Sequence, residues 1–517
     1  MAKNIYVIGI GGTGMRCLES FIHLCAIGMY DETNVHLMAL DTDKNNGNFK
    51  RLTSLVDNYS KINGGRVKSE TLFSANLKYY QFSPNYDKSD CTFNTVIDKM
   101  STLSTQVGDD VKVNLSDLID LSIRPEVGEM SLTHGYRAQT QMGSILMYYA
   151  ILEEAYASKN NTSSPLRSFL NEIITQGAGQ QIFVFGSVFG GTGASTIPVL
   201  PAALRDASKI LFGDNVNILG GNYFGSVVLT NYFTFEFEHS DAVVAKADKF
   251  ALNSQAALQF YKNDSTVNDV YKRLYLIGRE NMLKVGSGGT GGASQCNPAD
   301  YIELMSAFAA YDFFKVCDTA KSATNKDEAF GTKSNNRFVY KAIEATTHLK
   351  FSNFTEDDSI FMKKLGIMTA VSFLNTAYSL FDNLRLDSVS FDEKELVPLN
   401  IYLQLFGIKP YNDDQNREQY GWLNQIYNSA VGDGFTGGAF FMEQLFKCKE
   451  VKDFKKYKLN EQLYNMDTPP KFSVGLMTNK FSVVKDKFNT IKPDLESSLE
   501  SLIERLYLTL KSLYFNE

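Results

Sequence analysis

The sequence of 517 residues lacks the patterns that identify several protein classes. Its 6 cysteines include no Cys-x-x-Cys pair and its 5 histidines are scattered, which argues against a disulfide framework or a structural zinc site. No apolar run approaches the roughly 20 residues that a membrane-spanning helix needs. The N-terminus has no signal-peptide pattern, and no internal repeat of fixed period is visible. These absences predict a cytoplasmic protein without a membrane span.

A large basic surface is also missing. The formal net charge is −7, which argues against non-specific nucleic-acid binding. Phe and Tyr are abundant but do not alternate with Lys and Arg in a base-stacking pattern, so no nucleic-acid partner is expected. With 44% apolar residues, the chain can bury a sizeable core, and its length suggests two to four domains.

Two segments share the order of a buried strand, a glycine turn and a helix. In the first, the apolar run Asn4–Ile10 is followed by glycines up to Gly14; in the second, Gln181–Val188 is followed by GGTGAS at Gly190–Ser195. Such a turn directs backbone N–H groups and a helix N-terminus at one point, which attracts phosphate. One turn equally fits a dinucleotide-binding loop, but two turns on neighbouring strands suggest one triphosphate held from both sides.

The phosphate charge needs partners other than a Walker A lysine. Neither glycine turn is followed by Gly-Lys-Ser/Thr, so amides, hydroxyls and a metal ion must contribute, with Arg16 or Arg137 as candidate cations. A strand is expected over Val35–Leu40, and Asp41-Thr42-Asp43 follows it directly.

At this point the sequence resembles the tubulin/FtsZ superfamily, and within it the divergent bacterial tubulin-like proteins. FVFGSVFGGTGASTIPVL is similar to the family's signature segment, although Phe189 and Ser195 stand where glycines are usual. VIGIGGTGMRCLES resembles the first phosphate loop, MALDTD the segment after the second strand, and GYRAQTQMGS the third loop. VVLTNYFTFE and YLIGRENMLKV are similar to later family segments, in the same order. The resemblance covers about residues 1–330.

The resemblance implies bound GTP or GDP with Mg²⁺. Asp41 or Asp43 would hold the metal through water, with helix capping or turn chemistry as the alternative role of this pair. Glu236 would lie near the ribose and Asn281 near the base. Asp300 would read guanine, with Asn297 and Glu303 as neighbouring candidates and a helix-dipole role as the alternative. The implied nucleotide-binding residues are Gly11, Gly12, Thr13, Gly14, Met15, Arg16, Asp41, Asp43, Ala138, Gly190, Gly191, Thr192, Gly193, Ala194, Ser195, Glu236, Asn281 and Asp300.

Hydrolysis in this superfamily depends on acidic residues that a neighbouring subunit inserts. The matching positions here are Asn325, Asp327 and Glu328, which would orient the attacking water. Phe330 stands where the last acid is usual. This departure leaves a solvated charged linker as an equal interpretation.

The expected fold is α/β, with a Rossmann-like parallel-sheet GTPase domain, a long central helix and a second, smaller α/β domain. The expected boundaries are 1–297 for the nucleotide-binding domain, with an insertion at about 45–130, 298–317 for the central helix and 318–517 for the C-terminal domain. A leucine stripe from Leu495 to Leu513 predicts a terminal amphipathic helix that packs on the core.

The leading hypothesis is a filament-forming GTPase that contacts itself head to tail, and a further protein partner remains unidentified. A non-hydrolysing nucleotide sensor or scaffold is the first alternative, because the acidic loop and the signature segment are altered. A Rossmann-type NAD-dependent oxidoreductase is the second, although it leaves the second glycine turn without a role.

Overall fold

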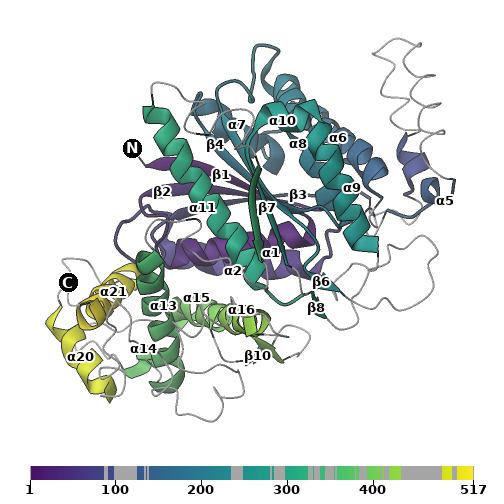
Figure 1. Ribbon diagram of the computed structural model, residues 1–517. Helices are drawn as coiled ribbons and strands as arrows, with labels where there is room; N and C mark the ends of the chain where they lie inside the picture. Colours follow the sequence, from purple (N-terminus) through teal and green to yellow (C-terminus); the bar gives the residue numbers. More distant parts are fainter. Residues whose placement is uncertain are drawn as a thin grey trace.

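The computed structural model is an α/β protein in which helices lie on both faces of one central sheet (Figure 1). The described residues are 2–86, 91–97, 125–132, 136, 139–234, 249–279, 282–284, 297–323, 330, 338–343, 354, 358–378, 380–383, 393–407, 410–412, 418–431, 480–491 and 498–515.

The central sheet has seven strands in the order β3-β2-β1-β4-β5-β7-β9, and neighbouring strands are parallel throughout. Strands covered on both faces need continuous apolar runs, and β1 and β4 have them, with six and seven consecutive buried residues respectively. The expected α/β class with a parallel sheet is therefore confirmed, and the sheet is compatible with a Rossmann-like domain. The strands are β1 (Lys3–Ile10), β2 (Thr33–Leu40), β3 (Asn76–Phe82), β4 (Gln181–Ser187), β5 (Tyr223–Leu229), β7 (Tyr271–Arg279) and β9 (Phe338–Ile343).

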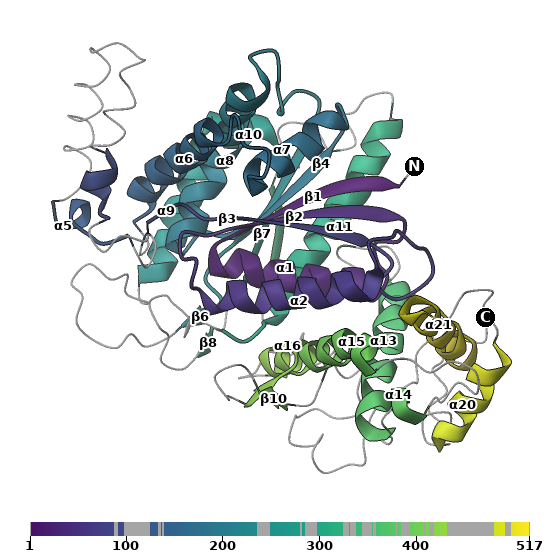
Figure 2. The same ribbon diagram turned by 180° about the vertical axis from the view of Figure 1, so that it is seen from behind.

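Alternate side chains of β1, β2, β4, β5 and β7 enter two hydrophobic cores. Ile5 and Val7 of β1 pack in one core with α1, α2 and α11, whereas Tyr6 and Ile8 pack in the other with α6, α7 and α8. Figures 1 and 2 show these two layers from opposite sides. The helices of the first layer are α1 (Gly11–Ala26), α2 (Gly47–Asn63) and α11 (Tyr301–Ser322). On the second face lie α6 (Thr140–Ala157), α7 (Pro165–Thr175), α8 (Gly191–Phe212), α9 (Phe250–Asn263) and α10 (Ser265–Val270).

Part of the expected insertion at about 45–130 belongs to the main sheet. Helix α2 and strand β3 complete a βαβ unit, and β3 pairs with β2 from Asn76 to Phe82. The polar composition conceals this strand because β3 is at the edge of the sheet, where only Leu77 and Phe82 are buried. A short helix, α5 (Pro125–Gly128), also precedes α6.

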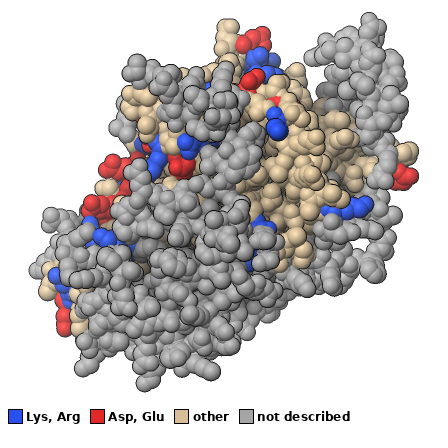
Figure 3. Space-filling model, in the orientation of Figure 1, with Lys and Arg blue, Asp and Glu red and all other residues tan. Residues whose placement is uncertain are grey.

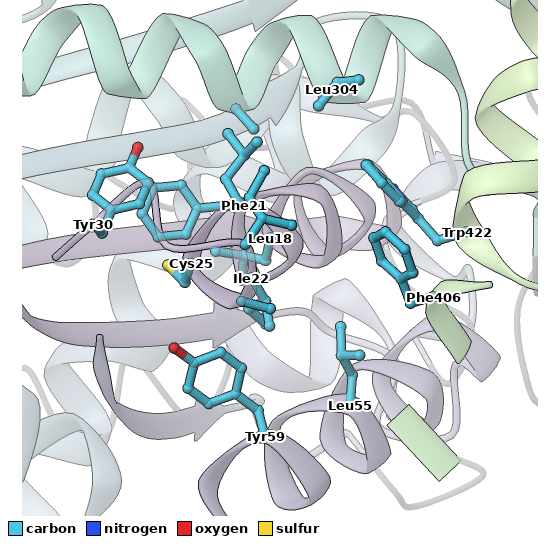
Figure 4. Packing of buried hydrophobic residues seen from close by; sticks show 14 of the residues in the cluster. Leu18, Phe21, Ile22, Cys25, Tyr30, Leu55, Tyr59, Leu304, Phe406 and Trp422 are labelled. Carbon is cyan, nitrogen blue, oxygen red and sulfur yellow. The ribbon is translucent and has the colours of Figure 1, made fainter. Parts of the chain in front are cut away.

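The C-terminal helices form a further layer against α1 and α2, and their side chains join the same core as those helices. Figure 4 shows Phe406 and Trp422 beside Leu18 and Ile22 of α1. The Trp422 indole donates to Ser20 Oγ at 3.0 Å. These helices are α13 (Asp358–Tyr378), α14 (Leu380–Asn383), α15 (Glu393–Phe406), α16 (Trp422–Val431), α20 (Lys480–Thr490) and α21 (Leu499–Phe515), the last being the expected amphipathic helix.

Three strands are described after α11, in the region expected to form the second α/β domain. β9 extends the main sheet beside β7, and the strands described beyond it are the antiparallel pair β10 (Pro410–Asn412) and β11 (Glu418–Tyr420). A two-stranded parallel ladder joins β6 (Phe233–Thr234) to β8 (Leu283–Lys284).

Two surface properties follow for the part of the chain that the structure describes. None of its helices is long and apolar enough to cross a membrane. On the face shown in Figure 3, the described acidic and basic side chains are interspersed, without a continuous basic patch.

Candidate nucleotide-binding site

The two glycine turns meet at the carboxyl ends of adjacent strands. β1 ends at Ile10 and α1 begins at Gly11, while β4 ends at Ser187 and α8 begins at Gly191. Gly11 has a φ of +67°, a conformation that L side chains rarely adopt. A Cβ atom built on Gly11 would lie 3.3 Å from Thr192 Cβ, so the turns are in direct contact. The chain runs from β1 towards β2 on one side and reaches β4 on the other, which makes this the switch point where α/β sheets bind ligands.

Both helix N-termini at this point lack a capping side chain. Neither Ile10 nor Gly190, the N-cap residues of α1 and α8, makes a side-chain capping bond, and neither first turn contains an acidic residue. The helices are 16 and 22 residues long, so their free N–H groups and dipoles favour an anion between them. Gly12, Gly190, Gly191 and Thr192 are half-buried, so this part of the turns is open to a ligand.

Asp41, directly after β2, lies beside the second turn. Its Oδ1 accepts hydrogen bonds from the Thr42 amide at 2.7 Å and from Thr192 Oγ1 at 3.3 Å. Burial raises the pKa of Asp41 to about 7, although the Thr42 bond opposes this rise. A cation bound beside this buried carboxylate would stabilise its ionised form.

Asp43 forms part of a tight turn before α2. Its Oδ1 accepts from the Asn45 amide at 3.0 Å, and its carbonyl accepts from the Asn46 amide. These bonds match the turn chemistry considered as an alternative for this residue.

The N-terminus of α2 also reaches the site, which the sequence reasoning missed. Asn46 caps this helix by accepting from the Asn48 amide at 2.8 Å. A Cβ built on Gly12 would be 3.1 Å from Asn48 Nδ2, and the buried Asn48 Oδ1 has no hydrogen-bond partner among the described residues. An Asn directly before an amphipathic segment is a helix-capping signal that could have identified the position.

Arg16 is engaged by buried partners. Its Nε donates to Glu303 Oε1 at 2.5 Å and its Nη2 donates to Tyr232 Oη at 2.9 Å. Tyr232 in turn donates to the same Glu303 oxygen at 2.5 Å. Burial raises the pKa of Glu303, and the Arg16 charge opposes that rise. This network ties the N-terminal part of α1 to the start of α11.

Asp300 is the N-cap residue of α11. Its Oδ1 accepts from the Ile302 amide at 2.9 Å, and the Glu303 carboxylate completes a capping box by accepting from the Asp300 amide. Its Oδ2 accepts from Arg279 Nη1 at 3.2 Å. Both oxygens therefore have protein partners, in line with the helix-terminus alternative for this acid.

The other residues of the two turns are mostly enclosed. Ser195 donates to the Gly191 carbonyl at 2.5 Å, and Thr13 accepts from Arg16 at 3.3 Å. Gly14, Met15, Gly193 and Ala194 are buried, so backbone groups are what they can offer to a ligand. Arg137, Ala138, Glu236, Asn281, Asn325, Asp327 and Glu328 lie outside the described residues.

The donor set fits a phosphate with a water-bound Mg²⁺. Free amides suit the anion, and carboxylate and hydroxyl oxygens are the ligands that Mg²⁺ prefers. The described residues include no group of three or more His, Cys, Asp or Glu placed to hold a metal, so phosphate oxygens and water would complete its coordination. Comparison of the chain with protein-family models and with curated proteins found no match.

Proposed function

We propose that this chain is a tubulin-like GTP-binding protein that hydrolyses GTP at a head-to-tail interface between subunits and assembles into filaments. The observation that carries nucleotide binding is the contact between two glycine turns, each opening a long helix without a capping side chain. The strand order β3-β2-β1-β4-β5 supports the proposal because it puts the switch point between the two turns.

Different residues of the site would contact the phosphate and the metal ion. Amides of the first turns of α1 and α8 would hold phosphate oxygens, with the Thr192 hydroxyl as a further donor. Asp41 would hold Mg²⁺ through water, and this ion would neutralise phosphate charge. Guanine selectivity and the acidic residues for hydrolysis rest on the family resemblance.

Nucleotide identity is tested by denaturing the purified protein and separating the released small molecules by chromatography, before and after incubation with GTP, ATP or NAD. We expect guanine nucleotide to be recovered selectively, at about one molecule per chain. Recovery of NAD, or of no nucleotide after any incubation, would contradict the proposal.

Assembly-coupled hydrolysis has a separate test. Because the active site would be completed by a neighbouring subunit, phosphate release per chain should rise with protein concentration and then level off. Light scattering should rise over the same range in GTP. Activity strictly proportional to protein concentration would leave nucleotide binding intact but remove the head-to-tail mechanism.

A further inference from the structure

A second recess lies on the α6 face of the sheet, beyond the end of β3. It is a cavity of about 580 Å³ between the chain that follows Phe82 and the C-terminal half of α6. This volume lies within the range of small-molecule sites, roughly 300–1,000 Å³. Its wall includes Phe82, whose carbonyl accepts from the Asp41 amide, so the cavity is adjacent to the candidate nucleotide site but separate from it.

The cavity has negative charge and aromatic walls. Glu153 and Glu154 of α6 line it together with Phe82, Tyr86 and Tyr149, and its described lining contains no Lys, Arg or His. Glu154 already accepts a hydrogen bond from Ser164 at 2.6 Å. Glu153 is exposed and makes no ion pair with a described basic side chain.

The field of Glu153 reaches two of the aromatic walls. Burial raises the pKa of Tyr149 to about 12, and the Glu153 charge adds to this rise. Burial also raises the pKa of Tyr86, again with a contribution from Glu153. Both phenols therefore stay neutral at ordinary pH.

We propose that this cavity binds a small organic cation carrying an amine or guanidinium group. A carboxylate beside neutral aromatic rings attracts such a group through charge pairing and cation–π contact. An anionic ligand would meet two carboxylates without a cation in the described wall. A neutral ligand would make no charge pairing with either carboxylate. The proposal is independent of the nucleotide that the glycine turns bind.

The test measures binding of three cations to the full chain by isothermal titration calorimetry. The probes are 1,5-diaminopentane, agmatine and choline, which present primary ammonium, guanidinium and quaternary ammonium groups. The neutral 1,5-pentanediol and the anionic glutarate are the matched controls. We expect one-to-one binding of at least one cation and no binding of either control.

Two variants locate the site. Glu153→Gln should weaken cation binding by about tenfold, because it removes one charge-assisted contact. Ala157→Trp should abolish binding, because Ala157 lines the cavity and is exposed at the end of α6, where a large ring can fill the space without disturbing a core. Asp214→Asn removes the same charge from an exposed loop and should leave binding unchanged.

Two results would overturn the proposal. One is the absence of binding by all three cations to a folded chain, checked by circular dichroism. The other is equal weakening by Glu153→Gln and Asp214→Asn, which would mean that the cations respond to the overall charge of the protein.

Discussion

The first glycine turn is anchored in the core, whereas the second is more open and lies beside an acid. Arg16, two residues after the last glycine of the first turn, is 4% exposed and bound to Glu303 and Tyr232. In the second, Gly190, Gly191 and Thr192 are half-buried, and Thr192 contacts Asp41. The same strand–turn–helix pattern is thus followed by a buried ion-pair network in one case and lies beside an acidic residue in the other. A change in the first turn should affect mainly stability, and a change in the second mainly binding.

The largest effect is expected from breaking the anchor of the first turn. Arg16→Met leaves the buried Glu303 without its cation, which should lower the free energy of unfolding by about 3–5 kcal/mol. Urea denaturation followed by circular dichroism measures this loss. The double variant Arg16→Met/Glu303→Gln should recover much of it, because the lone buried charge is gone.

A surface arginine provides the control for this variant. The Arg205 side chain is 39% exposed and pairs with Asp206, so Arg205→Met should change stability by less than about 1 kcal/mol. If Arg16→Met is as mild as Arg205→Met, the buried network does not anchor the first turn.

A smaller effect, dependent on pH, is expected beside the second turn. The pKa of Asp41 is raised from 3.8 to about 7, so the folded state binds this proton more tightly than the unfolded state. The contribution of Asp41 to the free energy of unfolding therefore falls as pH rises from about 4 to 7 and is lowest above 7. Asp41→Asn removes this penalty and should add about 2–4 kcal/mol to the free energy of unfolding at pH 8, and little at pH 4.

The comparison with Asp214→Asn tests whether this gain is local. Asp214 is exposed, so its replacement should give no pH-dependent gain. Asp41→Asn should at the same time weaken Mg²⁺-dependent nucleotide binding. If Asp41→Asn and the unmodified chain give the same unfolding curves at both pH values, burial does not destabilise the ionised Asp41 carboxylate.

Substitution of Gly190, in the second turn, separates nucleotide binding from stability. A Cβ at Gly190 would meet Ser187 Oγ at 3.5 Å, an ordinary contact, and its φ of −88° suits any residue. Gly190→Asp should weaken nucleotide binding by about 100-fold, or roughly 2.7 kcal/mol, because a carboxylate takes the phosphate's place at the helix N-terminus.

The matched variant Gly190→Asn has nearly the same shape without the charge. Both substitutions provide good N-cap residues, so neither should lower the melting temperature. We expect Gly190→Asn to weaken binding less than about tenfold in equilibrium titration with a fluorescent guanine nucleotide. Equal binding by the two variants would mean that no phosphate lies at the N-terminus of α8.

Much of the fold follows from local patterns. The apolar runs Asn4–Ile10 and Gln181–Val188 predict two central strands, and the glycines after them predict where α1 and α8 begin. The edge strand β3 was missed because only two of its seven residues are buried and its polar composition gives no continuous apolar run. Helix α7 was missed too, although Ser164 caps it and Pro165 opens it.

The sequence by itself determined the two glycine turns, because a strand, a turn and a helix N-terminus are each encoded within a few neighbouring residues. Only the tertiary structure decided how those turns are used. It paired Arg16 with Glu303 across 287 positions, brought Arg279 to the Asp300 carboxylate and placed β9 in the main sheet. Ion pairs, edge pairing and cavities depend on distances between remote segments, and those distances are set by how whole elements pack rather than by any local pattern.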